Sequence, residues 1–248
     1  MNRQPNEETE TFLTLDAART RRDFLRSAGL AGAVMAFAGC SSGSAEVLAP
    51  AMPPAGTNPA TPASGAVVAP NGDITLDFAN ELDVLNYAYA LEQLEAAFYT
   101  QVVANAAFGT AFSASEQRVL RDIRDHEVVH REFFGAALGT AKIPNLTPVF
   151  GTINFADRAS VLGTAKVFED LGVSAYNGAA KYLKSEVYLT LAGKIVSVEA
   201  RHASTIRDIL NPRSGDFAPN AFDLGNTPLT VLTAAGPFIV QKITVINA

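Results

Sequence analysis

The sequence has a single cysteine, no surplus of basic residues and no long apolar run. Because Cys40 is the only cysteine among 248 residues, no disulfide can form within the chain. Its 25 aspartates and glutamates outnumber 19 lysines and arginines, so the formal net charge is −6. Such a chain lacks the basic footprint of nucleic-acid-binding proteins and the polybasic segment that binds anionic lipid. No nucleic-acid partner is therefore expected.

The N-terminal 40 residues have the order of an export signal. Residues 20–26, TRRDFLR, resemble the twin-arginine translocation motif. The apolar stretch Ala28–Gly39 follows, and it is too short and too rich in Ala and Gly for a membrane-spanning helix. Paired arginines also occur in solvated N-termini, which is the alternative. We interpret residues 1–40 as a twin-arginine signal and expect export to the periplasm or cell envelope.

Cys40 ends the segment Phe37–Cys40, which resembles a lipobox, the sequence cleaved before a cysteine that then carries lipid. Membrane contact is expected only through such a lipid; the alternative is a small buried thiol. Residues 1–40 contain five basic and five acidic residues, so the net charge without them stays at 14 minus 20, or −6. Residues 41–72 are rich in Ala, Pro, Ser, Gly and Thr, which predicts a disordered tether.

From Asp73 to Pro212 the spacing of apolar residues predicts four helices. The predicted helices are 76–105, 113–138, 157–184 and 186–210, and the capping-box signature from Ser113 to Glu116 opens the second. About 18 residues, Gly139 to Ala156, separate the second helix from the third, which is longer than an antiparallel neighbour needs. The predicted fold is an all-α four-helix bundle with a long crossover between helices two and three.

Residues 213–248 are expected to form a C-terminal extension packed on the bundle. Scattered Pro and Gly residues interrupt any long helix there. The apolar stretch from Phe238 to Ile246 predicts either a short strand or an apolar cover on the bundle.

The motif Glu-x-x-His occurs twice, and each copy follows a Glu-x6-Tyr motif. The two sets are Glu92, Tyr99, Glu127 and His130, and then Glu169, Tyr176, Glu199 and His202. Residues three, four or seven apart share one face of a helix, so each motif presents its side chains together. The separation between the two glutamates is 35 residues in the first set (127 minus 92) and 30 in the second (199 minus 169). This repeat predicts a pseudo-twofold bundle whose halves supply matching ligands.

Four carboxylates gathered in an apolar core repel one another and lose hydration. Two divalent cations would neutralise them and leave the two histidines as nitrogen ligands. We expect Glu127 and Glu199 to bridge the ions, with Glu92 and Glu169 each capping one. Mixed carboxylate and imidazole ligation suits iron or manganese, and these residues do not choose between the two.

Residues 75–210 resemble the ferritin-like superfamily. Within it, the segments Ala90–Tyr99 and Val198–Ala203 are similar to the desiccation-related branch of bacteria and plants. The resemblance implies a ferritin-like bundle with a carboxylate-bridged pair of metal ions, usually iron, that reacts with oxygen or peroxide. Iron is therefore favoured over manganese as the cofactor.

Some residues leave alternatives open. Glu95 competes with Glu92 as a ligand, or else accepts hydrogen bonds beside the site or faces solvent. His126 could replace Glu127, although its counterpart in the second half is Val198, which favours a position outside the ligand set. Tyr99 and Tyr176 either take part in redox chemistry or are core aromatics bonded to a carboxylate.

Other polar residues next to the motifs have simpler interpretations. Asp170 beside Glu169 is expected to be a surface charge. Asp125 and Arg201 either orient the histidines or face solvent.

Three functions fit this pattern. The leading one is an exported di-iron protein with oxidase or peroxide-consuming activity linked to stress protection, with oxygen or peroxide as its substrate. The second is a stress-protective envelope protein whose metal is structural, since ligands that bind only the folded state stabilise it. The third is a manganese catalase. Nothing in the pattern specifies an oligomeric state.

Overall fold

A computed structural model of the protein describes residues 64–248. The predicted signal at residues 1–40, Cys40 and residues 41–63 of the predicted tether lie outside this range. Among the described residues, no helix combines the length and apolar character needed to cross a membrane.

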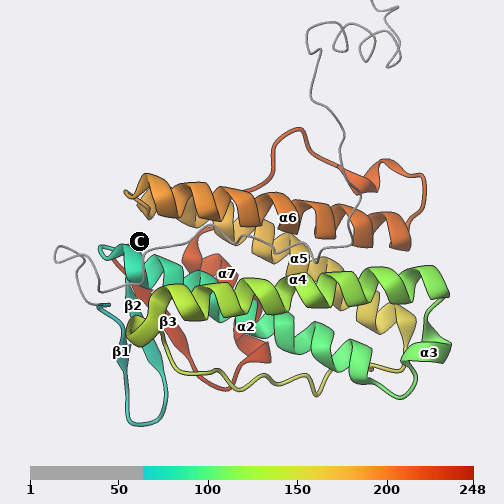
Figure 1. Ribbon diagram of the computed structural model, residues 1–248, viewed down its shortest axis with the longest axis horizontal. Helices are drawn as coiled ribbons and strands as arrows, with labels where there is room; N and C mark the ends of the chain where they lie inside the picture. Colours follow the sequence, from blue (N-terminus) through green and yellow to red (C-terminus); the bar gives the residue numbers. More distant parts are fainter. Residues whose placement is uncertain (1–63) are drawn as a thin grey trace, which may run out of the picture. The chain divides into compact units, whose positions relative to one another are not determined.

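Four long helices form the bundle and are joined into two hairpins (Figure 1). Their bounds are α2 Glu81–Ala104, α4 Ala114–Leu138, α5 Arg158–Ala179 and α6 Glu186–Leu210, and the short helix α3 Phe108–Ala111 lies in the first hairpin. Helix α2 packs along α4 and α5 packs along α6, whereas contacts between the hairpins are less extensive. The predicted helical bundle with a long crossover after its second long helix is confirmed.

Polar side chains cap the long helices at their first turns. The hydroxyl of Ser113 accepts a hydrogen bond from the backbone N–H of Glu116, and the Glu116 carboxylate accepts one from the N–H of Ser113. At the start of α6, the hydroxyl of Ser185 accepts from the N–H of Tyr188. These bonds satisfy N–H groups that have no partner within the helix, so α4 begins where the capping-box signature predicts it.

The long crossover is held against α2 by two amide side chains. After a 3-10 turn, residues 142–157 follow an irregular path. The Oδ1 of Asn86 accepts a hydrogen bond from the N–H of Ile143, and the Oε1 of Gln93 accepts one from the N–H of Leu146, both at 2.8 Å. Since Asn86 and Gln93 are two helical turns apart, they lie on one face of α2 and guide the crossover along it.

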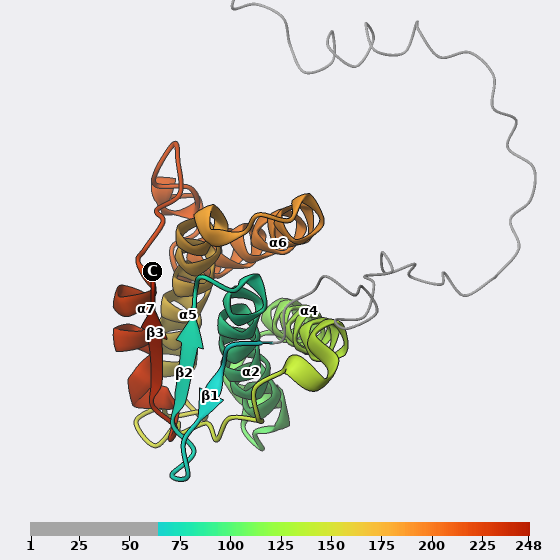
Figure 2. The same cartoon turned by 90° about the vertical axis from the view of Figure 1, so that its left-hand side faces the viewer.

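A small three-stranded sheet lies beside helix α2 (Figure 2). Its strands are β1 Val67–Val68, β2 Ile74–Asp77 and β3 Ile243–Ile246. Strand β2 pairs antiparallel with β1 and parallel with β3, so Ile74 lies opposite Ile243. Ile74 and Leu76 are buried in the core. The pairing ties the C-terminal end of the chain to the segment just before α2.

This sheet corrects two sequence-based predictions and decides between the alternatives of a third. Residues 64–72 belong to β1 and its turn, so the described end of the predicted tether is structured. The first long helix begins at Glu81 rather than at residue 76, because residues 74–77 alternate buried and half-buried side chains and pair with β3. Of the two alternatives for residues 238–246, the strand is found, limited to residues 243–246.

The third long helix is shorter than predicted. Helix α5 ends at Ala179, and a 3-10 turn, Ala180–Tyr182, replaces the predicted continuation to residue 184. The C-terminal segment lies against α5, and it contains the additional helix α7 Pro228–Ala235. The backbone N–H of Asn226 donates to the carbonyl oxygen of Ser174 at 2.9 Å. The contact is close because Gly178, one turn further along α5, has no side chain.

Substituting Gly178 with alanine is expected to destabilise the protein by about 1–3 kcal/mol. A Cβ at this position would lie 1.8 Å from the backbone oxygen of Asn226, so the C-terminal segment would have to move. Gly163→Ala, on the same helix, is the control, because no atom lies within 4 Å of its added Cβ. That variant should be stabilised by about 0.5–1 kcal/mol. Urea unfolding measures both values, and equal stabilisation of the two variants would contradict the tight contact.

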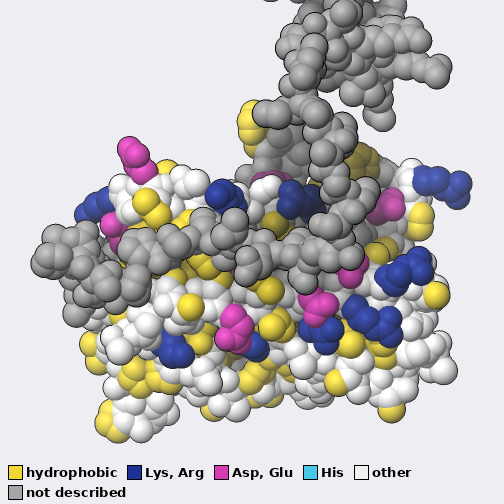
Figure 3. All heavy atoms as spheres, viewed as in Figure 1, with side chains coloured by type: hydrophobic (Ala, Val, Ile, Leu, Met, Phe, Trp, Pro, Cys, Tyr) yellow, Lys and Arg dark blue, Asp and Glu magenta, His cyan; other side chains and the backbone are white. Residues whose placement is uncertain are grey.

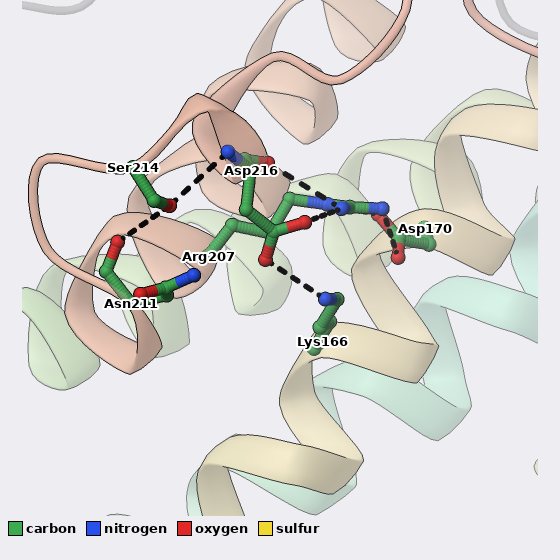
Figure 4. Close-up of polar contacts among 6 residues, drawn as sticks. All are labelled: Lys166, Asp170, Arg207, Asn211, Ser214 and Asp216. Carbon is green, nitrogen blue, oxygen red and sulfur yellow. Dashed lines mark hydrogen bonds and ion pairs between the residues drawn. The ribbon is translucent and has the colours of Figure 1, made fainter.

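Arg207 on α6 is linked both to α5 and to the C-terminal segment (Figure 4). Its Nη2 donates to Asp170 at 2.6 Å, and its Nη1 donates to Asp216 at 2.9 Å. The Nζ of Lys166 donates to the same Asp216 at 3.0 Å. The Asp170 carboxylate is therefore paired with Arg207 near the protein surface. Its sequence neighbour Glu169 is buried instead.

Charges of both signs are interspersed on the face shown in Figure 3. Lysine and arginine side chains lie beside aspartates and glutamates there, without gathering into a patch of one sign.

Candidate metal centre

The six residues of the repeated motifs meet inside the bundle. Helix α2 carries Glu92, α4 carries Glu127 and His130, α5 carries Glu169, and α6 carries Glu199 and His202. The four glutamates are fully buried, and the histidines are 9% and 5% exposed. Each long helix thus contributes at least one polar side chain to the core of the bundle, where most of the buried residues are apolar.

These side chains form two overlapping groups that could each hold a metal ion. The groups are Glu92, Glu127, His130 and Glu199, and Glu127, Glu169, Glu199 and His202. Within each group the candidate ligand atoms all lie within 4.8 Å of one another. Glu127 and Glu199 belong to both groups, whereas Glu92 and Glu169 each belong to one. The two shared residues are the glutamates predicted to bridge the ions, and the bridging itself stays a prediction.

The two histidines direct the same nitrogen at the carboxylates. The Nδ1 of His130 lies 3.0 Å from Oε1 of Glu199 and 3.4 Å from Oε2 of Glu92. The Nδ1 of His202 lies 2.8 Å from Oε1 of Glu127 and 3.4 Å from Oε2 of Glu169. Each histidine therefore faces one capping glutamate and at least one shared glutamate.

Most of the buried polar atoms that lack a well-aligned hydrogen bond could serve as ligands to two metal ions. They include both carboxylate oxygens of Glu127 and Glu199, the Oε2 of Glu92 and Glu169, and the Nδ1 of His130 and His202. Buried polar atoms are rarely left without a partner. Shared between two ions, these atoms supply one nitrogen and three oxygens to each. This mixed donor set suits iron or manganese, so the residues present fit a pair of such ions.

The two motif tyrosines bind the capping glutamates crosswise. The hydroxyl of Tyr99 on α2 donates to Oε1 of Glu169 on α5, and the hydroxyl of Tyr176 on α5 donates to Oε1 of Glu92 on α2. Each bond fixes one carboxylate oxygen and leaves the other directed at the histidine. The interpretation of both tyrosines as core aromatics bonded to a carboxylate therefore agrees with the structure, and a redox role stays a prediction.

Without metal, protons hold this cluster together. Burial lowers the pKa of His202, but the carboxylates of Glu127 and Glu169 outweigh it and raise the pKa to about 10. Glu127 and Glu199 likewise raise the pKa of His130 despite its burial. Burial tends to raise the pKa of Glu127, but the two histidines lower it to about 2. In the metal-free cluster, two imidazolium groups thus provide the positive charge that metal ions would otherwise provide.

The remaining glutamates shift in the opposite direction. Burial raises the pKa of Glu92 to about 7. Burial also raises the pKa of Glu199 well above its usual value, and the charge of Glu127 adds to the shift. These carboxyls hold protons that a metal ion would have to displace.

Glu95 is a fifth buried carboxyl that belongs to neither group. Its position in the repeat corresponds to Gly172, three residues after Glu169 as Glu95 is three after Glu92. A Cβ on Gly172 would lie 3.1 Å from Oε1 of Glu95, so the glycine leaves the space that this carboxyl fills. Burial and the charges of Glu199 and Glu127 raise the pKa of Glu95 well above its usual value. The pairing with Gly172 is a signal that sequence reasoning missed.

His126 lies outside the two groups but contacts one of their members. It is exposed, and its Nδ1 lies 2.9 Å from Nε2 of His202, with the ring centroids 5.2 Å apart and the ring planes 13° from parallel. Of the other polar neighbours, Asp125 pairs with Arg124 at the surface, and Arg201 donates to Ser197. Neither bonds to a histidine. The repeat could not reveal the His126 contact, because the second half has Val198 at that position.

The comparison with known families agrees with the fold and the cluster. Among proteins of curated function, none matches the chain. The family model of the ferritin-like domain matches residues 80–212, which are more than half of the chain and include all four long helices and all six cluster residues. The chain therefore belongs to the ferritin-like domain family.

Proposed function

We propose that this protein is exported, binds two divalent metal ions, preferably iron, and consumes oxygen or peroxide in stress protection. The observation that carries the proposal is the set of eight buried donor atoms left without an aligned hydrogen bond. Export is supported by the twin-arginine-like segment at residues 20–26 and lipid attachment by the lipobox-like Cys40. The desiccation-related resemblance supports the link to stress.

His130 and Glu92 would hold one ion, His202 and Glu169 the other, and Glu127 and Glu199 both. A bound ferrous pair would supply the two electrons that reduce one peroxide to two waters, a reaction that also takes up two protons. The donor atoms lie on four helices whose side chains are fixed by packing. The chain therefore offers a preorganised site rather than one assembled on binding.

Tyr99 and Tyr176 orient Glu169 and Glu92 through their hydrogen bonds. Glu95 holds a proton on a buried carboxyl outside both groups, and a proton source is what reduction of peroxide requires. The surrounding aliphatic and aromatic side chains exclude bulk water from the cluster. Only a small reactant such as oxygen or peroxide suits a site whose carboxylates are fully buried.

Anaerobic loading with two equivalents of ferrous iron, followed by peroxide, tests the proposal. We expect near-ultraviolet absorbance of ferric iron bound to carboxylates, and peroxide consumption faster than with the same iron free in solution. The protein loaded with redox-inactive zinc is the control and should consume none. Failure to bind either iron or manganese after careful loading would end the proposal.

Two other functions have specific support. Because the cluster joins all four long helices, bound ions could serve only to stabilise the fold. In that case metal would raise the unfolding temperature while the iron and manganese forms left peroxide intact. The donor set also suits manganese. Release of oxygen from peroxide by the manganese-loaded protein, without added reductant, would identify a catalase.

A further inference from the structure

The pseudo-twofold symmetry of the cluster is broken at one histidine. His202 has a second imidazole beside it, because His126 lies one turn before His130 on α4 and reaches across to α6. The corresponding residue on α6 is Val198, whose aliphatic side chain can neither donate nor accept a hydrogen bond. Within residues 64–248, the polar contacts of His130 all involve its Nδ1.

The contact with His126 suits the tautomer that His202 must adopt as a metal ligand. The Nδ1 of His202 faces Glu127 and Glu169, so this nitrogen must give up its proton to act as a ligand. A neutral imidazole keeps one proton, which must then be on Nε2. At 2.9 Å, this Nε2–H donates to Nδ1 of His126, whose own proton lies on the opposite nitrogen.

The position of His126 suits the role of an acceptor. It is exposed, so its outer nitrogen can donate to water while its inner nitrogen accepts from His202. The two rings meet edge to edge at an interplanar angle of 13°, so the hydrogen bond restricts rotation of His202. A ligand histidine held in one tautomer and one orientation binds metal more strongly than a free one.

We propose that His126 is a positioning residue that makes the two metal positions unequal, so that the ion held by His202 binds first. This inference rests on the proposed metal binding but not on any reaction at the metals. Partners of this kind typically contribute about 10–100-fold to metal affinity. The position at His130 lacks such a partner and should fill second.

Titration of the metal-free protein with Co²⁺, followed by visible absorbance and calorimetry, tests the proposal. The wild type should bind two ions in two resolved steps. His126→Val, which copies the residue at position 198, should weaken the first step by about 10–100-fold and bring the two steps together. His126→Asn places an amide oxygen near the position of the lost Nδ1 and should restore most of the difference. Val198→Ala is the matched control on α6 and should bind as the wild type does.

The outcomes separate this inference from the proposed function. If the wild type binds two ions and His126→Val gives the same two steps, the role of His126 is wrong while metal binding stands. If the wild type binds no ion, both fail. Nitrogen-15 NMR of the zinc-loaded wild type gives an answer that needs no variant. A proton on Nε2 of His202 is expected, and its absence would overturn the proposal.

Discussion

Lowering the pH from about 7 to about 6 is expected to weaken the combined binding of two divalent ions by about 1000-fold. The reason is that His130, His202 and Glu199 have raised pKa values in the metal-free fold. Each must lose its proton before it can bind metal, and Glu92, whose pKa is about 7, gives up part of another, so about three protons or more leave when two ions enter. Every released proton changes the combined association constant by about tenfold per pH unit.

A pH-indicator dye in weakly buffered solution at pH 7 counts these protons directly, and chelator competition at several pH values gives the affinity. Glu95→Gln is the matched control, because Glu95 lies outside both groups and should keep its proton when metal binds. The variant should therefore release as many protons as the wild type. A count lower by one would show that Glu95 is a ligand, and an affinity independent of pH would contradict the protonated cluster.

Glu199→Gln is expected to weaken the binding of both ions together. Glu199 belongs to both groups, and an amide cannot offer two charged oxygens to two ions. The loss should exceed the roughly 10–100-fold contributed by residues that only support a ligand. Since the pKa of Glu199 is raised in the metal-free protein, glutamine resembles its protonated form and should leave the fold intact.

Glu92→Gln provides the comparison, because Glu92 belongs to only one group. This variant should bind one ion much more weakly and the other ion with an affinity near that of the wild type. Calorimetry with Co²⁺ measures both stoichiometries, and circular dichroism verifies the helices. If the two variants lost affinity in the same way, the assignment of Glu199 as the shared carboxylate and Glu92 as a capping one would be wrong.

Most of the bundle could be predicted because its signals are local. Apolar residues recurring every three or four positions and the capping box at Ser113 depend on neighbours along the chain. The predicted helix start at residue 76 was wrong for a tertiary reason. Residues 74–77 pair with β3, more than 160 positions away, and no local pattern indicates this pairing.

The sequence alone determined which six side chains share the helix faces, because spacings of three and seven residues bring side chains to one side of a helix. It also determined the long crossover, because this prediction needs only the number of residues between the second and third helices. Only the tertiary structure decided that the tyrosines bind crosswise, that Gly172 leaves room for Glu95 and that His126 contacts His202. These contacts join residues on different helices, 70 or more positions apart, and their geometry depends on how the two hairpins pack.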